Sequence, residues 1–292
     1  MLVSFIFSTV SPAFADFTPD EETKLRALMN YVIATKGDSN TPASVTKTDG
    51  TEANAATVLG YGAGAYGNYS TALGYGANAS VDFSTALGVV ATASGSQSTA
   101  LGYRANAIGN YSVSLGSYAT ASGEASTSLG YKATASSEYS TSLGYRANAS
   151  GDRATALGHY ANASGKQSTA LGYRTNSIGD YSTALGYSAN TIGDCSTALG
   201  YLANASGRDS TALGYLAKAI EDYSTALGYS ANASGDYSMA MGYKAYSAGE
   251  NSIAIGREAN TSSYTGAVAL VRALSQRKIM LFQWVLHRRN EK

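Results

Sequence analysis

Small apolar and polar residues recur along most of this chain with a period of fourteen. Counted from Leu59, a Leu-Gly pair or its equivalent returns every fourteenth residue up to Ile255, giving fifteen copies without an insertion. Ser lies three places before Leu in 13 of 15 copies and Thr two places before it in 12. Ala lies four places after Leu in 14 copies and six places after it in 11. Places two residues apart share one face of a β-strand, and a fixed period of this kind indicates a solenoid.

Each copy is expected to form one coil of that solenoid. We predict a strand Ser-Thr-Ala-Leu, a bend at the Gly found in all fifteen copies, a second strand Tyr-x-Ala-Asn-Ala, and a turn Ser-Gly-Asp whose Gly takes a positive φ. Stacked coils place each strand about 4.8 Å from its copy in parallel register. The predicted fold class is therefore all-β, a parallel solenoid of fifteen coils over residues 56–266.

The first predicted strand has two uncharged faces. Ser and Ala share one face with the bend Gly, and Thr and Leu share the other, so both faces are expected to be buried. A fourteen-residue coil encloses space for little more than alanine, so the Leu column must be buried against another chain. We therefore expect an obligate homo-oligomer whose interface includes Leu73, Leu87, Leu101, Leu143, Leu185 and Leu227.

The second predicted strand is expected to be half-solvated. Its Tyr and Ala residues share one side, and the places between them carry basic or small polar residues. The outward basic residues are candidate ligand contacts, with a solvated surface as the alternative; they are Arg104, Lys132, Arg146 and Arg174.

Composition narrows the choice of partner. The chain has 20 basic and 20 acidic residues, which argues against nucleic acid and against a polybasic grip on lipid. It has 32 Gly and only 3 Pro, a balance that favours tight turns in hydrogen-bonded β structure over disorder. The single Cys195 replaces a repeat Tyr and excludes an internal disulfide or a cysteine metal cluster.

The segments outside the repeats have different patterns. Residues 1–15 combine an apolar run with Ala13-Phe14-Ala15, which predicts a signal peptide and hence export. Residues 16–37 are expected to form a short amphipathic helix with Thr18 as N-cap, and residues 38–55 a linker. No segment is long and apolar enough to span a membrane as a helix.

No catalytic or cofactor-binding set can be assembled. Residues 62–67 match G-x-G-x-x-G but are repeat positions with no helix after them, and His159 and His287 have no partner for a metal site or triad. Two columns have both a structural and a chemical interpretation. The recurring turn aspartates, either solvated turn formers or a loose cation site, are Asp152, Asp180, Asp194, Asp222 and Asp236. The Asn-Ala-Ser sequons, expected to form a stacked ladder in preference to carrying glycans, start at Asn78, Asn148, Asn162, Asn204 and Asn232.

The phrases STALGYSANASGDYS, SMAMGYKAYSAGENS and NSIAIGREANTSS resemble the head repeats of YadA-type trimeric autotransporter adhesins. The resemblance covers residues 56 to about 266. It implies a left-handed parallel β-roll, a homotrimer packed through the inner strands, no enzymatic activity, and a head that displays adhesion surfaces on bacteria. Collagen binding in the family is associated with an NSVAIG motif, whose nearest match here is Asn251, Ser252, Ile253, Ala254, Ile255 and Gly256.

Residues 267–292 depart from the family, which continues into a neck, a stalk and an outer-membrane anchor. This segment is basic and loses the period. The neighbouring reading frame of residues 278–285 allows a neck-like phrase. Our hypothesis is a frameshift near Leu270 that replaced the neck, stalk and anchor. Two locations are then expected for the protein: display on the cell surface, as in the family, or release from the cell without an anchor.

From the repeats and the family resemblance we predict an adhesin head that binds collagen, another extracellular matrix protein or a host surface glycan. Two alternatives remain: an ice-binding solenoid that uses its Thr column, and a non-functional adhesin fragment.

Overall fold

The computed structural model describes residues 55–271, which form two compact units divided between Ser136 and Ser137. The predicted signal peptide, the 16–37 helix, nearly all of the 38–55 linker and residues 272–292 of the basic tail lie outside the described residues. Every element within 55–271 is a β-strand, and no helix occurs in that range.

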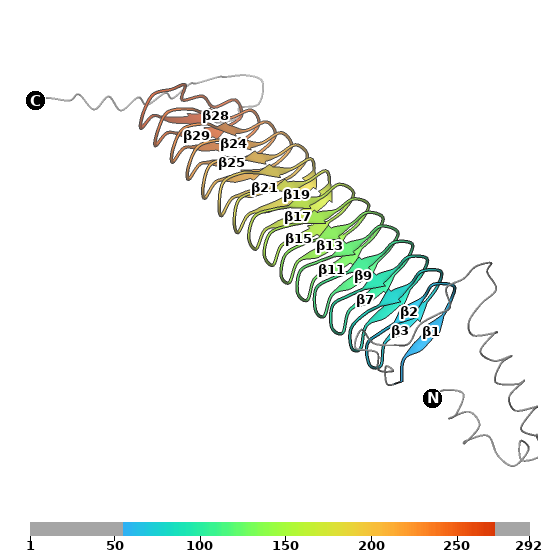
Figure 1. Ribbon diagram of the computed structural model, residues 1–292. Helices are drawn as coiled ribbons and strands as arrows, with labels where there is room; N and C mark the ends of the chain where they lie inside the picture. The colour runs from blue at the N-terminus through green and yellow to red at the C-terminus, as the bar shows by residue number, and fades with distance from the viewer. Residues whose placement is uncertain (1–54, 272–292) are drawn as a thin grey trace, which may run out of the picture. The chain divides into compact units, whose positions relative to one another are not determined.

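In the first unit each coil contributes one longer and one shorter strand (Figure 1). The longer strands are β1 (Thr57–Leu59), β3 (Thr71–Leu73), β5 (Thr85–Leu87), β7 (Thr99–Leu101), β9 (Val113–Leu115) and β11 (Thr127–Leu129). The shorter strands are β2 (Gly64–Ala65), β4 (Asn78–Ala79), β6 (Thr92–Ala93), β8 (Asn106–Ala107), β10 (Thr120–Ala121) and β12 (Thr134–Ala135).

The second unit repeats the arrangement. Its longer strands are β13 (Thr141–Leu143), β15 (Thr155–Leu157), β17 (Thr169–Tyr173), β19 (Thr183–Tyr187), β21 (Thr197–Leu199), β23 (Thr211–Leu213), β25 (Thr225–Leu227), β27 (Met239–Met241), β29 (Ile253–Gly256) and β30 (Val268–Val271). Its shorter strands are β14 (Asn148–Ala149), β16 (Asn162–Ala163), β18 (Asn176–Ser177), β20 (Asn190–Thr191), β22 (Asn204–Ala205), β24 (Lys218–Ala219), β26 (Asn232–Ala233) and β28 (Tyr246–Ser247).

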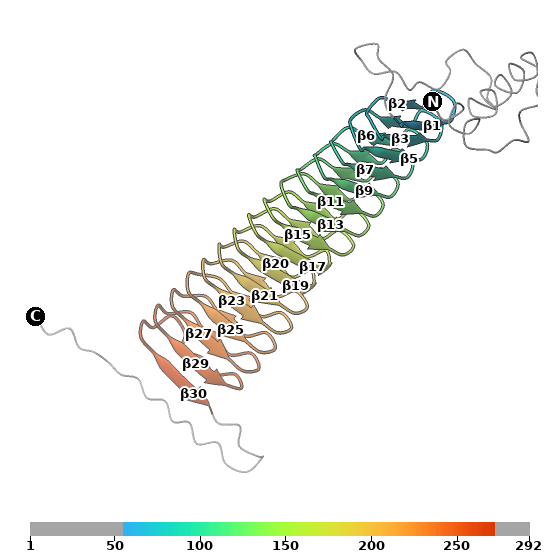
Figure 2. The ribbon, with the colours of Figure 1, turned by 90° about the horizontal axis from the view of Figure 1, so that it is seen from below.

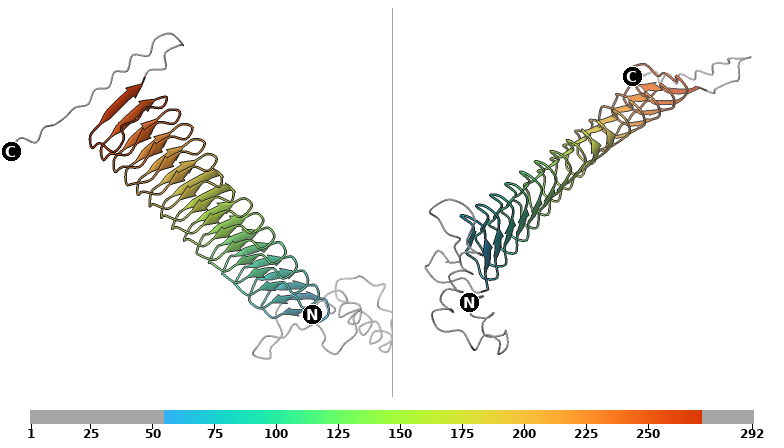
Figure 3. Two further views of the ribbon diagram at one scale, coloured as in Figure 1. Left: turned by 90° about the horizontal axis from the view of Figure 1, so that it is seen from above. Right: turned by 90° about the vertical axis from the view of Figure 1, so that its right-hand side faces the viewer.

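Within each unit the longer strands form one parallel sheet and the shorter strands a second (Figure 3). Each residue pairs with its own repeat position in the next coil, as Thr71 does with Thr85 and Leu73 with Leu87. The identical register follows from the invariant period, because a step of fourteen brings like residues into line. The predicted all-β parallel solenoid is confirmed.

The interior between the two sheets holds only small side chains. Among residues 55–271, every buried apolar side chain is Ala, and every buried polar side chain is Ser or Thr. Thr191, which replaces an inner Ala, places its Oγ1 at 3.1 Å from the Oγ atoms of both Ser177 and Ser182, whereas the Oγ1 of Thr175 has no hydrogen-bond partner. The expectation that a coil encloses little more than alanine is therefore confirmed.

The second strand is shorter than predicted. It comprises only two residues, as in Asn106–Ala107, whereas the preceding Tyr103 and Arg104 belong to a turn. The third residue after Leu takes the left-handed conformation in every described coil, with φ of 53° at Arg104 and 52° at Arg146. This reversal turns the Tyr outward into solvent while the Ala positions stay inside, so Tyr and Ala do not share one side.

The turn Gly is required for a different reason from the one predicted. Gly193 has no positive φ; the left-handed residue in this turn is Cys195, with φ of 56°. A Cβ on Gly193 would lie only 2.0 Å from the carbonyl oxygen of Gly207 in the next coil. The close approach of neighbouring coils therefore favours Gly at the eighth place after Leu, where it occurs in 11 of 15 copies, whereas the bend Gly after Leu does need its φ of 118–138°.

The longer-strand sheet extends past the expected end at residue 266. Strand β30 pairs in parallel with β29 and places Val268, Ala269 and Leu270 beside Ile253, Ala254 and Ile255 (Figure 2). The step is fifteen residues here, and the additional residue is accommodated in the intervening turns, so the register of the strands is retained.

Two glycines of one coil provide a stability test. Gly74 has φ of +131° and a Cβ there would lie 2.5 Å from the Gly88 carbonyl oxygen, whereas Gly76 has φ of +61° and room for a Cβ. We expect Gly74→Ala to lower the free energy of unfolding by about 3 kcal/mol or more, and Gly76→Ala by only about 1 kcal/mol. Urea denaturation followed by circular dichroism measures both. Equal losses would contradict the close-approach argument.

Candidate functional site

The turns that follow the longer strands carry a column of aromatic rings; we call them the tyrosine turns. In the second unit the rings two places after Leu stack face to face, with centroids 4.8–5.2 Å apart and planes within 13° of parallel. The ladder comprises Tyr145, His159, Tyr173, Tyr187, Tyr201, Tyr215, Tyr229 and Tyr243. Because its rings lie against one another, this column presents ring edges and hydroxyls to solvent.

Basic residues occupy the left-handed place beside this aromatic column. The four predicted contacts, Arg104, Lys132, Arg146 and Arg174, are all exposed. Each lies over an adjacent Tyr ring, as Arg104 does over Tyr103 at 5.5 Å and Arg174 over Tyr173 at 5.4 Å. Such contacts contribute about 0.5–1 kcal/mol each at exposed sites and hold the cations along the surface.

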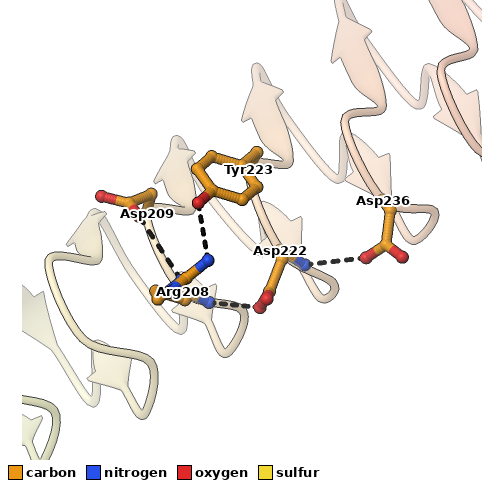
Figure 4. Close-up of polar contacts among 5 residues, drawn as sticks. All are labelled: Arg208, Asp209, Asp222, Tyr223 and Asp236. Carbon is orange, nitrogen blue, oxygen red and sulfur yellow. Dashed lines mark hydrogen bonds and ion pairs between the residues drawn. The ribbon is translucent and has the colours of Figure 1, made fainter.

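The opposite turns, which follow the shorter strands, are called the aspartate turns. Their Asp side chains cap the neighbouring coil: Asp222 Oδ1 accepts from the Arg208 backbone N–H at 2.8 Å, and Asp236 Oδ1 from that of Asp222 at 3.2 Å (Figure 4). Asp180 and Asp194 do the same. The recurrence of Asp thus has a structural explanation, and no group of three metal-ligating side chains occurs within residues 55–271.

The outer face of the shorter strands carries the predicted asparagine ladder. Each side-chain amide donates to the next Asn carbonyl oxygen, at 2.7–2.9 Å, from Asn148 through Asn162, Asn176 and Asn190 to Asn204. The ladder ends where this repeat position is not Asn, as at Lys218, which pairs with Asn204. The structural interpretation of these Asn residues is confirmed for this run.

The Thr and Leu face of the longer strands is open in the single chain. The Ser and Ala face is buried, whereas Leu side chains such as Leu101, Leu143 and Leu199 remain 36–39% exposed. The expectation that both faces are buried holds within one chain only for the Ser and Ala face. The other predicted interface residues, Leu73, Leu87, Leu185 and Leu227, lie in the same column and are half-buried or exposed.

The collagen-type motif at residues 251–256 is divided between two faces of the coil. Ser252 and Ala254 are fully buried in the interior, so they present no side chain to a ligand. Asn251 is an exposed turn residue, and Ile253 and Ile255 lie on the Thr and Leu face with Gly256 as the bend. The structure therefore does not bring the six residues together as one surface.

Two further candidate site residues, Tyr118 and Tyr160, were not predicted from the sequence. Each occupies the left-handed place three after Leu, between basic residues of the coils before and after it. The fourteen-residue alignment carried this signal, because Arg104, Tyr118 and Lys132 fall in one column.

The other chemical candidates stay isolated. Residues 62–67 run from a turn into β2 with no helix after them, His159 is one ring of the ladder, and Cys195 is an exposed turn residue. The described coils contain no apolar helix of membrane-spanning length.

Comparison with known proteins identifies the repeats. A family model described as the YadA head domain repeat (2 copies) matches residues 52–77, 65–91, 93–119, 121–147, 149–175, 177–203, 205–231 and 233–259. The chain belongs to the YadA head repeat family. The recognition of YadA-like head repeats from the sequence is thereby confirmed.

The structural comparison adds a distant match to the YadA head. The crystal structure of the collagen-binding domain of Yersinia adhesin YadA is 20% identical, over 60% of this chain and 74% of that chain, with a TM-score of 0.27. The comparison with curated proteins found no match. The family assignment therefore rests on the repeat match.

Asn176 tests the contribution of the asparagine ladder to these YadA head repeats. Its amide donates to Asn190 and its carbonyl oxygen accepts from Asn162, so Asn176→Ala removes two partly buried hydrogen bonds. We expect a loss of about 1–3 kcal/mol in the free energy of unfolding. Lys218→Ala, at the same repeat position but without such a bond, should change it by less than about 0.5 kcal/mol. Urea midpoints that fall equally for both variants would contradict a stabilising role for the ladder.

Proposed function

We propose that this chain is the ligand-binding head of a bacterial surface adhesin, assembled as a homotrimer of left-handed β-rolls. The observation that carries the proposal is the family match over most of the chain, together with the uncovered Thr and Leu face. Export through residues 1–15 and action at the cell surface are part of the proposal, supported by the apolar start and by the family.

The uncovered face supports self-association. Its Leu column repeats once per coil, and covering the exposed part of each side chain contributes about 1 kcal/mol. Contiguous apolar surface of this extent is uncommon on monomers and marks an interaction site. Parallel copies present the same column at the same height, so a rotationally symmetric assembly buries Leu against Leu along the whole unit.

Ligand contact is expected on surfaces that remain outside such an assembly. Collagen remains a candidate through Asn251, although Ser252 and Ala254 are interior and Ile253 and Ile255 lie on the face assigned to assembly. The outward cations of the tyrosine turns are better placed for contact. Another extracellular matrix protein or a host surface glycan then binds through many weak contacts repeated along the head.

The ice-binding alternative requires the Thr column to be free. Thr71 and Thr85 share their face with Leu73 and Leu87, so the same self-association covers both columns. A monomer with measurable thermal hysteresis would favour the ice-binding function over ours.

Oligomeric state tests the assembly. We expect the purified full chain to have three times its monomer mass by light scattering, and the double variant Leu185→Glu, Leu227→Glu to be monomeric because six buried carboxylates oppose assembly. Lys218→Glu, on the outer face of the other sheet, serves as the control and should stay trimeric. Circular dichroism checks that each variant keeps its strand content. A wild-type monomer would refute the proposed trimer.

Adhesion is tested with beads that carry the purified full chain. They should be retained on collagen-coated or cell-derived matrix more strongly than albumin-coated beads, because multivalent display multiplies weak contacts. The Leu185→Glu, Leu227→Glu variant should lose most of this retention. Wild-type retention no greater than that of albumin on every matrix would overturn the adhesin function.

A further inference from the structure

In each unit, two cations at the left-handed place three after Leu lie over a tyrosine at the same place in the coil between them. In the first unit, Arg104 and Lys132 lie over the ring of Tyr118, at 5.8 and 5.6 Å from its centroid. In the second unit, Arg146 and Arg174 lie over the ring of Tyr160, at 5.6 and 5.9 Å. We call these the cation clusters.

The backbone fixes the spacing of each cluster. All three residues of a cluster occupy the same left-handed turn position in successive coils, with φ between 52° and 59°. The two cations of a cluster are therefore two coils, or about 10 Å, apart along the stacking direction. Arg146 also donates from a guanidinium NH to the Tyr160 hydroxyl at 3.1 Å, which holds its charged group at the surface.

No carboxylate neutralises these four cations within residues 55–271. The ion pairs of this part of the chain are Arg153 with Asp152, Arg208 with Asp209, and Arg257 with Glu258. Acidic residues gather in the opposite aspartate turns, and the tyrosine turns hold a single one, Glu258. Each cation cluster is thus an exposed positive site whose charges have no carboxylate partner within the described residues.

The aromatic rings of the clusters are partly covered by their neighbours. Tyr118 and Tyr160 each have one cation from the coil before and one from the coil after over the ring, and Tyr103 and His159 approach them edge-on at 5.3 and 4.6 Å. Single-stranded nucleic acid relies on bases stacking on free aromatic faces, so it fits this surface poorly. The groups left for a ligand are charged nitrogens and tyrosine hydroxyls, which suit a chain rich in anions and hydroxyls.

We propose that the cation clusters bind a sulfated polysaccharide that lies along the stacking direction. Sulfate groups along the chain contact the paired cations, and sugar hydroxyls contact the tyrosine hydroxyls. A single exposed ion pair contributes little, so affinity depends on engaging several cations at once, on one chain and on its copies. The inference names a ligand class for the proposed adhesin and rests on that function.

Binding of the full chain to immobilised heparin, a sulfated polysaccharide, tests the proposal. We expect saturable binding that weakens steeply as salt is raised. The fourfold variant Arg104→Gln, Lys132→Gln, Arg146→Gln, Arg174→Gln should bind at least about tenfold more weakly. Replacing the same four residues by the other basic residue, Lys for Arg and Arg for Lys132, should restore most of the binding.

A matched control removes the same charge elsewhere. The variant Arg153→Gln, Lys166→Gln, Arg208→Gln, Lys218→Gln also loses four cations, three in the aspartate turns and one on the Asn face. We expect it to bind heparin within about twofold of wild type. Equal losses in the two fourfold variants, or no heparin binding by wild type, would overturn the proposal.

Two rival occupants give distinct results. If the clusters contact the acidic edge of a second copy, the cluster variant changes the mass of the assembly. If they bind nucleic acid, a poly-dT oligonucleotide competes with heparin at equal charge concentration. Either result overturns the proposal, whereas an unchanged mass and selective competition by dextran sulfate over dextran and poly-dT support it.

The bead assay separates this inference from the adhesin function. Cluster-variant beads that are retained on matrix as well as wild-type beads would refute the polysaccharide contact and leave adhesion intact. Wild-type beads that fail to adhere while the purified chain still binds heparin through the clusters would refute adhesion alone. Circular dichroism melting of all variants excludes loss of fold as the cause.

Discussion

The close approach of the two sheets within each coil determines most of the molecule. Their separation leaves room for little more than a methyl or hydroxymethyl group, so the interior side chains of the described residues are Ala and Ser with a few Thr. Larger apolar side chains therefore have to lie on the outside of the coil. The half-exposed Leu column is the direct result, and the proposed self-association would relieve it by burying that column between chains.

The sequence determined the fold to a large extent because its period has no interruption up to Ile255. Alternation of Ser with Ala and of Thr with Leu indicated the two faces of the longer strand, and the asparagine ladder followed from its column. Backbone reversals were not predictable in the same way. The left-handed place three after Leu is occupied by Arg, Lys, Tyr, Ser, Leu, Val, Glu and Gly, so no residue type marks it. The second strand was consequently predicted too long.

Glycine shows why a residue type alone is a poor guide to geometry. The bend Gly after Leu needs its unusual φ, whereas Gly193 is limited by the carbonyl oxygen of the next coil. Both read as turn residues in the sequence. The distinction depends on the distance between coils, which only the folded chain provides. The candidate site could also be predicted only in part. Arg104 and Lys132 were identified as outward cations, but the role of Tyr118 between them becomes visible only when three successive coils are stacked.

The two kinds of turn use their polar side chains in different ways. Aspartates bind backbone amides of the neighbouring coil and so stabilise the stack, while the four cations of the cation clusters in the tyrosine turns have no carboxylate partner within the described residues. The net charge of the chain is zero, yet opposite signs collect at opposite edges of each unit. A neutral total therefore conceals a surface with directional electrostatics.

The fifteen-residue step before β30 shows which part of the coil tolerates a change in length. One additional residue between Ile253 and Val268 leaves the pairing of Ala254 with Ala269 intact, since the turns absorb it. The strands thus keep their register, and the turns are the places where residues can be inserted without changing that register. Peptides grafted at such a turn would be presented at a defined height on a rigid support, which makes the repeat a natural scaffold for displaying foreign epitopes.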